Sequence, residues 1–205
     1  MTNLEAAVKD LITEDMRRCA EIEGVSAEYI KNSLIDGSVI VVKNKLRRSI
    51  EALAIGKGLR TKVNANIGTS QDRADIKEEL EKLKAAVKAG ADAVMDLSTG
   101  GPVDVIRRAV LKGSPVPVGT VPIYQAALHA KKKGKSFVEL EGEEIFEVIE
   151  THAQDGVDFI TAHCGVTRSS VDRIKKEGRI MGIVSRGGAL TAEWMRHNKK
   201  ENPLY

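Results

Sequence analysis

From residue 61 onward the sequence alternates short apolar runs with amphipathic stretches, and this alternation restricts the fold more than any other feature. Apolar runs at 63–68, 93–98, 116–121, 158–162 and 180–184 predict strands. After each run, apolar residues recur every three or four positions, which predicts a helix. Ser70 or Asp72 is the expected N-cap of the first of these helices. The repetition indicates an α/β fold with a parallel sheet and helical crossovers.

Polar residues close several of the predicted strands. In parallel barrels the carboxyl ends of the strands carry the ligand site. No glycine-rich dinucleotide motif follows a strand, and no phosphate-binding P-loop is present. We therefore expect a (β/α)8 TIM-barrel type fold, with about five of its eight units in residues 61–205. The strand-end residues are Asn66, Asp96, Ser98, His163 and Ser185.

An open half-barrel exposes strand edges and an apolar interior, so a second chain or additional chain length is expected to complete it. Residues 1–60 read as a short helical and β extension ahead of residues 61–205, the partial barrel that is expected to be the substrate-binding half. The pattern predicts one amphipathic helix over 3–23, a second over 27–34 and a strand within 37–42.

The segment 114–126 contains three of the five prolines. Proline fixes its own φ and pushes the preceding residue into an extended conformation, so Val-Pro alternation predicts a short rigid strand. The strand leads directly into a helical pattern, and Tyr124 lies at that junction. The tyrosine is therefore expected near the carboxyl rim of the sheet, where ligands bind.

Composition excludes several classes of protein. The aromatic share of 3% and net charge of +3 argue against a nucleic-acid partner, and the lysines of 131–135 are interpreted as a solvated loop. No apolar run approaches the roughly 20 residues of a membrane span, and no signal peptide is recognisable. The two cysteines, Cys19 and Cys164, have no metal-binding spacing and fit a reducing cytoplasm.

Each rim residue has a functional and a structural interpretation. The Asn66 amide can hydrogen-bond the polar edge of a ligand or the backbone of its own turn. Met95 can contact a ligand or belong to the core. Tyr124 can stack on a flat heterocycle or staple the start of its helix. His163 can act as an acid, base or donor, or lie satisfied in the core. From the residues alone, these alternatives remain open.

The sequence Ser185-Arg186-Gly187-Gly188 is the strongest local signal. Glycines before a helix expose backbone N–H groups, and the helix dipole and an arginine both favour a phosphate or carboxylate. The alternative is a glycine turn with a surface arginine. These features predict binding of a small polar or phosphorylated ligand, but they do not specify a reaction.

Several strings resemble, in order, those of the ThiC family of phosphomethylpyrimidine synthases. They are NANIG at 64–68, MDLSTG at 95–100, SPVPVGTVPIYQA at 114–126, GIVSRGG at 182–188 and ENPLY at 201–205. Two positions depart from the family pattern: the segment before Asn44 lacks a proline, and Cys164 replaces an alanine. The resemblance covers the amino-terminal part of the family, from about residue 11 to 205.

The resemblance implies a barrel enzyme that rearranges 5-aminoimidazole ribonucleotide into 4-amino-5-hydroxymethyl-2-methylpyrimidine phosphate for thiamine, as a cytoplasmic homodimer. It implies S-adenosylmethionine, a 4Fe-4S cluster and zinc as cofactors. Their ligand motifs are absent from these residues, so no metal ligand or catalytic residue is assigned and the chain alone is expected to be inactive. The implied substrate contacts are Asn66, Met95, Tyr124, His163, Ser185, Arg186 and Gly187.

Two alternatives remain open from the sequence. A related radical enzyme makes 5-hydroxybenzimidazole from the same ribonucleotide and shares the pocket motifs. A non-catalytic ribonucleotide-binding remnant would also keep them. The chain would then be a fragment, one half of a split enzyme, or that remnant.

Overall fold

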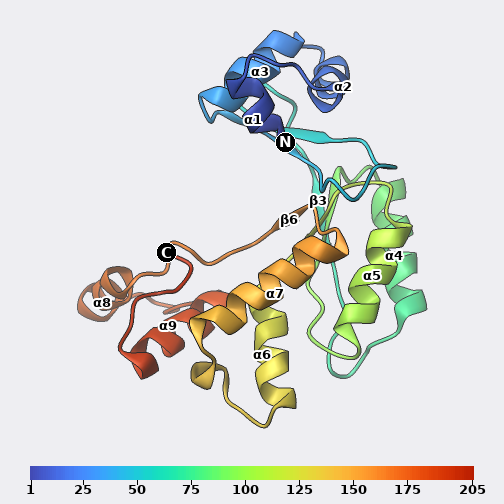
Figure 1. The fold of residues 1–205 in the computed structure, drawn as a ribbon. Helices are drawn as coiled ribbons and strands as arrows, with labels where there is room; N and C mark the ends of the chain where they lie inside the picture. The colour runs from blue at the N-terminus through green and yellow to red at the C-terminus, as the bar shows by residue number, and fades with distance from the viewer. The chain divides into compact units, whose positions relative to one another are not determined.

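The computed structural model describes residues 1–205 as a mixed α/β protein (Figure 1). The strands form a two-stranded sheet and a four-stranded sheet with the order β3-β4-β5-β6. The chain divides into two compact units, Met1–Thr120 with Asp155–Phe159 and Val121–Gln154 with Ile160–Tyr205. No helix combines the length and apolar character needed to cross a membrane. The sequence-based boundary at residue 60 stays a prediction.

The amino-terminal residues form two helices where the sequence pattern predicted one over 3–23, so that prediction is wrong. Helix α1 (Asn3–Val8) ends before Asp10, which has a φ of 60°. Thr13 then caps α2 (Glu14–Glu23), because its hydroxyl accepts a hydrogen bond from the Met16 N–H at 3.2 Å. The apolar spacing continues through the break, so periodicity alone did not reveal it.

Helix α3 (Ala27–Ile35) and strand β1 (Val39–Val42) confirm the elements predicted at 27–34 and 37–42. Strand β2 (Leu53–Gly56), which the sequence analysis missed, pairs antiparallel with β1, Val42 opposite Leu53. Val39 and Ala54 pack with buried residues of the three helices in one core cluster. The hairpin and helices thus share a core within the first unit.

The parallel sheet confirms the α/β prediction. Strand β3 (Asn64–Ile67) pairs in parallel with β4 (Ala93–Asp96), which pairs in parallel with β5 (Val118–Thr120). Helices α4 (Ile76–Lys88) and α5 (Val103–Gly113) contact each other, and their apolar faces share a core with the sheet. The members of that core with the least exposure are Val94, Ile106, Val110 and Val118.

The fourth strand of this sheet is β6 (Phe159–Ile160), but the fifth predicted strand does not form. Residues 180–184 have no strand pairing, and the side chains of Ile180, Met181 and Val184 are exposed. An apolar run becomes a strand only when a neighbour pairs its N–H and C=O groups. The sequence reveals the apolar run but not whether another strand lies beside it, which is why the prediction of a fifth strand was wrong.

The second unit is helical. It contains α6 (Pro122–Lys132), the 3-10 turn η1 (Phe137–Glu139), most of α7 (Gly142–Asp155), α8 (Arg168–Glu177) and α9 (Arg186–Asn198). The buried Trp194 of α9 donates its indole N–H to the Leu140 carbonyl at 2.7 Å, which fixes α9 beside η1. The lysine-rich segment 131–135 is exposed, as predicted, and Lys133 pairs with Glu144 at 2.8 Å.

A buried ion pair joins distant parts of the first unit. Arg47 Nη1 lies 2.5 Å from Asp158 Oδ2, and the Asp158 side chain has no exposed surface. Asp158 also accepts hydrogen bonds from the backbone N–H groups of Asn44 and Val118, both at 2.8 Å. The same guanidinium donates to main-chain carbonyls around the α5–β5 turn, those of Leu111, Ser114 and Val116.

Candidate functional site

Two of the predicted site residues lie together in the first unit. Asn66 and Met95 are direct partners in the β3–β4 register. Side chains alternate along a strand, so Met95 lies on the sheet face opposite Val94, which packs in the helical core. Asn66 is exposed and Met95 is 7% exposed. The sheet therefore presents an amide beside a thioether on the face away from α4 and α5.

The β5 position next to Met95 is Gly119, and a side chain there is excluded. A Cβ atom at Gly119 would lie 2.4 Å from the ring of Phe159, so the ring covers the strand where the side chain would stand. Asn66, Met95 and Gly119 are neighbours across the three strands, and the Phe159 ring occupies the side-chain position at Gly119.

The other five predicted site residues lie together in the second unit. Tyr124 is in the first turn of α6, which Pro122 starts, and Arg186 is the first residue of α9. The guanidinium carbon of Arg186 lies 5.3 Å from the centroid of the Tyr124 ring, a cation–π geometry. A stacked guanidinium keeps its N–H donors available in its own plane for an anion.

His163 contacts the start of the same helix. Its Nε2 lies 3.0 Å from the Ser185 hydroxyl oxygen, which also accepts the Gly188 N–H at 3.1 Å as the α9 N-cap. A Cβ atom at Gly187 would lie 2.1 Å from imidazole Cε1, so only glycine leaves room for the ring. The Nδ1 atom is buried without a hydrogen-bond partner. Burial lowers the pKa of His163, which favours the neutral imidazole.

The helix after Ser185 begins earlier than predicted. The sequence analysis placed Gly187 and Gly188 before the helix, whereas α9 begins at Arg186 and includes both. Glycine is a poor helix former, but the Ser185 cap and tertiary packing place Gly187 and Gly188, both buried, in the first turn. The dipole and first-turn N–H groups of α9 therefore act at Ser185 to Gly187, the residues expected to bind an anion.

Sequence reasoning missed Asn202 as a support for the site. Its side-chain amide donates to the carbonyls of His163 at 2.8 Å and Val166 at 3.0 Å, and the residue is 4% exposed. It therefore holds the loop that carries the imidazole. The ENPLY string was a signal for this segment, but the string gave no indication of the contact.

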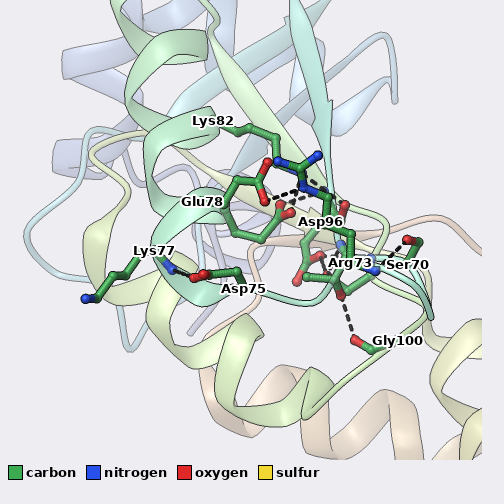
Figure 2. Close-up of polar contacts among 12 residues, drawn as sticks. Ser70, Arg73, Asp75, Lys77, Glu78, Lys82, Asp96 and Gly100 are labelled. Atoms are coloured by element: carbon green, nitrogen blue, oxygen red, sulfur yellow. Dashed lines mark hydrogen bonds and ion pairs between the residues drawn. The ribbon is translucent and has the colours of Figure 1, made fainter.

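The ends of β3 and β4 carry a dense polar network (Figure 2). Asp96 is 6% exposed, and burial raises the pKa of its carboxyl, with the Glu79 charge acting in the same direction. Asp75, rather than Ser70 or Asp72, caps α4, because its carboxylate accepts the Lys77 N–H at 2.7 Å. The Ser70 hydroxyl instead accepts the Arg73 N–H at 3.2 Å.

The residues present do not fit an iron–sulfur cluster or a zinc ion. Cys19 is buried and Cys164 is exposed, and burial raises the pKa of the Cys19 thiol to about 11. A thiol of that pKa is a poor source of the thiolate that both metals require. No group of three or more His, Cys, Asp or Glu side chains is arranged to hold a metal ion.

Comparison with known proteins identifies relatives along the full chain. The phosphomethylpyrimidine synthase of Syntrophus aciditrophicus is 57% identical over 205 residues, which are 100% of this chain and 48% of the relative. The enzymes of the same name from Thermodesulfovibrio yellowstonii and Geobacter metallireducens are 55% and 56% identical over the whole chain, covering 48% and 47% of their lengths. The chain thus spans about half the length of these curated relatives.

A family model described as the Radical SAM ThiC family matches residues 2–205. The match covers both sheets and every helix that carries a candidate site residue. The chain belongs to the radical SAM ThiC family.

Proposed function

We propose that this chain is the ribonucleotide-binding part of a phosphomethylpyrimidine synthase, a lyase that makes the pyrimidine moiety of thiamine. The observation that carries the proposal is the start of α9, where Ser185, Arg186 and Gly187 meet the imidazole of His163 and the ring of Tyr124. The relatives' name supports the reaction class. The proposed substrate is 5-aminoimidazole ribonucleotide.

The phosphate and the polar groups of that substrate have counterparts among these residues. The phosphate suits the first turn of α9 and the guanidinium of Arg186. The imidazole of His163, which contacts Ser185 through Nε2, lies beside that turn. Asn66 offers both a donor and an acceptor to a polar ligand edge, and Met95 offers an adaptable apolar contact.

The proposal includes a larger fold. The four strands of the larger sheet would form part of a (β/α)8 barrel, with residues 1–60 as an extension and 61–205 as the substrate-binding portion. Exposed Ile180, Met181 and Val184 support the idea that more chain, or a second chain, covers this region. A cytoplasmic homodimer is the proposed assembly.

S-adenosylmethionine, a 4Fe-4S cluster and zinc belong to this proposal only through the family. Because Cys19 and Cys164 do not fit a metal site, we assign cluster and zinc ligands to regions of the enzyme other than these residues. We assign these residues only to binding and orienting the ribonucleotide.

Calorimetry with 5-aminoimidazole ribonucleotide tests the function. The chain is expected to bind the ribonucleotide, and Arg186→Ala is expected to abolish the signal because the phosphate loses its guanidinium. The matched control is Arg173→Ala, since Arg173 is an exposed arginine of α8 whose side chain pairs with Glu177 at 3.2 Å. Unchanged affinity in Arg186→Ala would overturn the phosphate assignment, and absence of binding by the unsubstituted chain would overturn the binding role.

A further inference from the structure

Two polar residues at the predicted rim, Asp96 and Ser98, have no place in the proposed ribonucleotide pocket. Asp96 follows Met95, so its side chain lies on the opposite sheet face, toward the helices. Its Oδ1 atom accepts the Ser98 backbone N–H at 2.9 Å and the Ser98 hydroxyl at 2.5 Å. A buried carboxylate that receives two donors from one residue fixes the conformation of the loop after β4.

The same hydroxyl connects this loop to the neighbouring strand. Ser98 Oγ accepts the backbone N–H of Thr69, the second residue after β3, at 3.1 Å. Thr69 in turn donates its hydroxyl to the Gly100 carbonyl at 2.7 Å, and its own carbonyl accepts the Thr99 N–H at 2.9 Å. The β3–β4 pairing thus continues past the ends of both strands, through side chains as well as backbone.

A second buried carboxylate holds the β3 end from α4. Glu79 is 2% exposed, and its Oε2 accepts the Gly68 N–H at 2.8 Å. Lys82 pairs with Glu79 and donates to the Gly68 carbonyl at 3.3 Å. Gly68 has a φ of 145°, and a Cβ there would lie 2.7 Å from Leu97 C and Ser98 N. The two loops are therefore in backbone contact at this point.

We propose that Asp96, Ser98 and Glu79 are positioning residues for the ribonucleotide site. They fix the carboxyl ends of β3 and β4 so that Asn66 and Met95 stay side by side, facing the ligand. The inference rests on the proposed ligand role of Asn66 and Met95. The positioning residues act from the helix side of the sheet and the loops, without touching the ligand.

The test is a set of substitutions at the shared hydroxyl, measured in two ways. Ser98→Ala removes the link between Asp96 and Thr69, and Ser98→Thr keeps a hydroxyl that can replace it. Glu78→Gln is the matched control, because Glu78 bonds only the exposed Arg73 in this network, at 2.8 Å. Should Ser98→Ala fail to fold, the nearly isosteric Thr69→Val loosens the same pair of loops, because it removes the Thr69 hydroxyl that donates to the Gly100 carbonyl.

The first measurement is the calorimetric affinity for 5-aminoimidazole ribonucleotide. Ser98→Ala is expected to weaken binding about tenfold, as the loss of a buried hydrogen-bonding group does, and Ser98→Thr to restore it. Glu78→Gln is expected to bind as the unsubstituted chain does. Equal affinity in Ser98→Ala and the unsubstituted chain would overturn the proposal.

The second measurement needs no ligand. In methyl-labelled protein, the Met95 methyl signal is expected to move in Ser98→Ala and return in Ser98→Thr, while the signals of Met16 and Met195 stay in place. If the chain binds no ribonucleotide but shows this pattern, the proposed function is wrong, whereas Ser98 still positions Met95. An unmoved Met95 signal would overturn positioning, whatever the ligand result.

Discussion

The imidazole of His163 lies directly against the α-carbon of Gly187, so closely that a Cβ at residue 187 would stand 2.1 Å from Cε1. The two residues come from the loop after β6 and the first turn of α9. Their contact leaves the imidazole bonded to Ser185 through Nε2 and buried at Nδ1. Any side chain at 187 must therefore displace the ring that the proposed site uses.

Gly187→Ala is expected to expel the imidazole and to lower the free energy of unfolding by about 1–3 kcal/mol, the usual cost of overpacking. Urea unfolding measures the loss, and the His163 ring signal in an NMR spectrum reports the displacement. Gly165→Ala is the control, since nothing lies within 4 Å of a Cβ at that position. Equal stability and an unmoved ring signal in Gly187→Ala would contradict the contact.

The pKa of His163 is expected below its ordinary value of 6.5, because burial disfavours the charged ring. The unfolded chain then takes up the proton first as the pH falls. This contribution to stability is present above pH 6.5 and is lost as the pH drops through 6.5 toward the folded-state pKa. An NMR titration of the ring checks the direction, with His163→Gln to assign the signal. A midpoint at or above 6.5 would refute the prediction.

Tyr124→Leu is expected to weaken ribonucleotide binding about two- to fivefold, because the Arg186 guanidinium loses the ring beneath it and the interaction is worth about 0.5–1 kcal/mol. Tyr124→Phe keeps the ring and is expected to bind like the unsubstituted chain. Calorimetry compares the two variants. A loss in Tyr124→Phe equal to that in Tyr124→Leu would show that the hydroxyl, not the stack, matters.

Arg47→Ala is expected to lower the free energy of unfolding by about 3–5 kcal/mol, since it leaves the fully buried carboxylate of Asp158 without its partner. Urea unfolding measures the difference. Arg48→Ala is the control, because the neighbouring arginine is exposed and a surface change of this kind stays within about 0.5 kcal/mol. Similar values for both variants would contradict the importance of the ion pair.

The chain by itself is expected to be inactive on S-adenosylmethionine. Its only two cysteines, Cys19 and Cys164, cannot supply the thiolates of an iron–sulfur cluster. The assay reconstitutes the chain with iron, sulfide and a reductant, then measures cleaved S-adenosylmethionine. A sample without iron is the control, and turnover above it would defeat the prediction.

Periodicity predicted most of the helices that cover the parallel sheet. The buried face of a helix is formed by apolar residues three or four positions apart, so the local sequence reveals it. Helix α4 follows the first predicted strand of the parallel sheet, and α6 begins directly after β5, both as expected. The pattern failed where a local cap or an absent neighbour decided the outcome. Thr13 splits the first helix, and residues 180–184 have no strand to pair with.

The candidate site was predictable as a set of residues but not as an arrangement. The family resemblance pointed to His163, Ser185 and Gly187, yet the fit of ring against glycine depends on two segments more than 20 residues apart. The polar residues at the ends of the strands indicated Asp96 and Ser98, but they did not show that the two bond each other or that Ser98 also bonds Thr69. Such contacts depend on loop conformation, which the strand and helix periods do not encode.

The pairing of Arg47 with Asp158 also has a consequence for the order of folding. The two side chains are 111 residues apart in sequence, so their contact closes a long loop. The conformational entropy of that loop is lost before the ion pair can form. During synthesis the arginine leaves the ribosome well before the aspartate exists. The sheet core around β5 therefore reaches its final form only after residue 158 has emerged, and nascent chains that end earlier carry an arginine without its carboxylate.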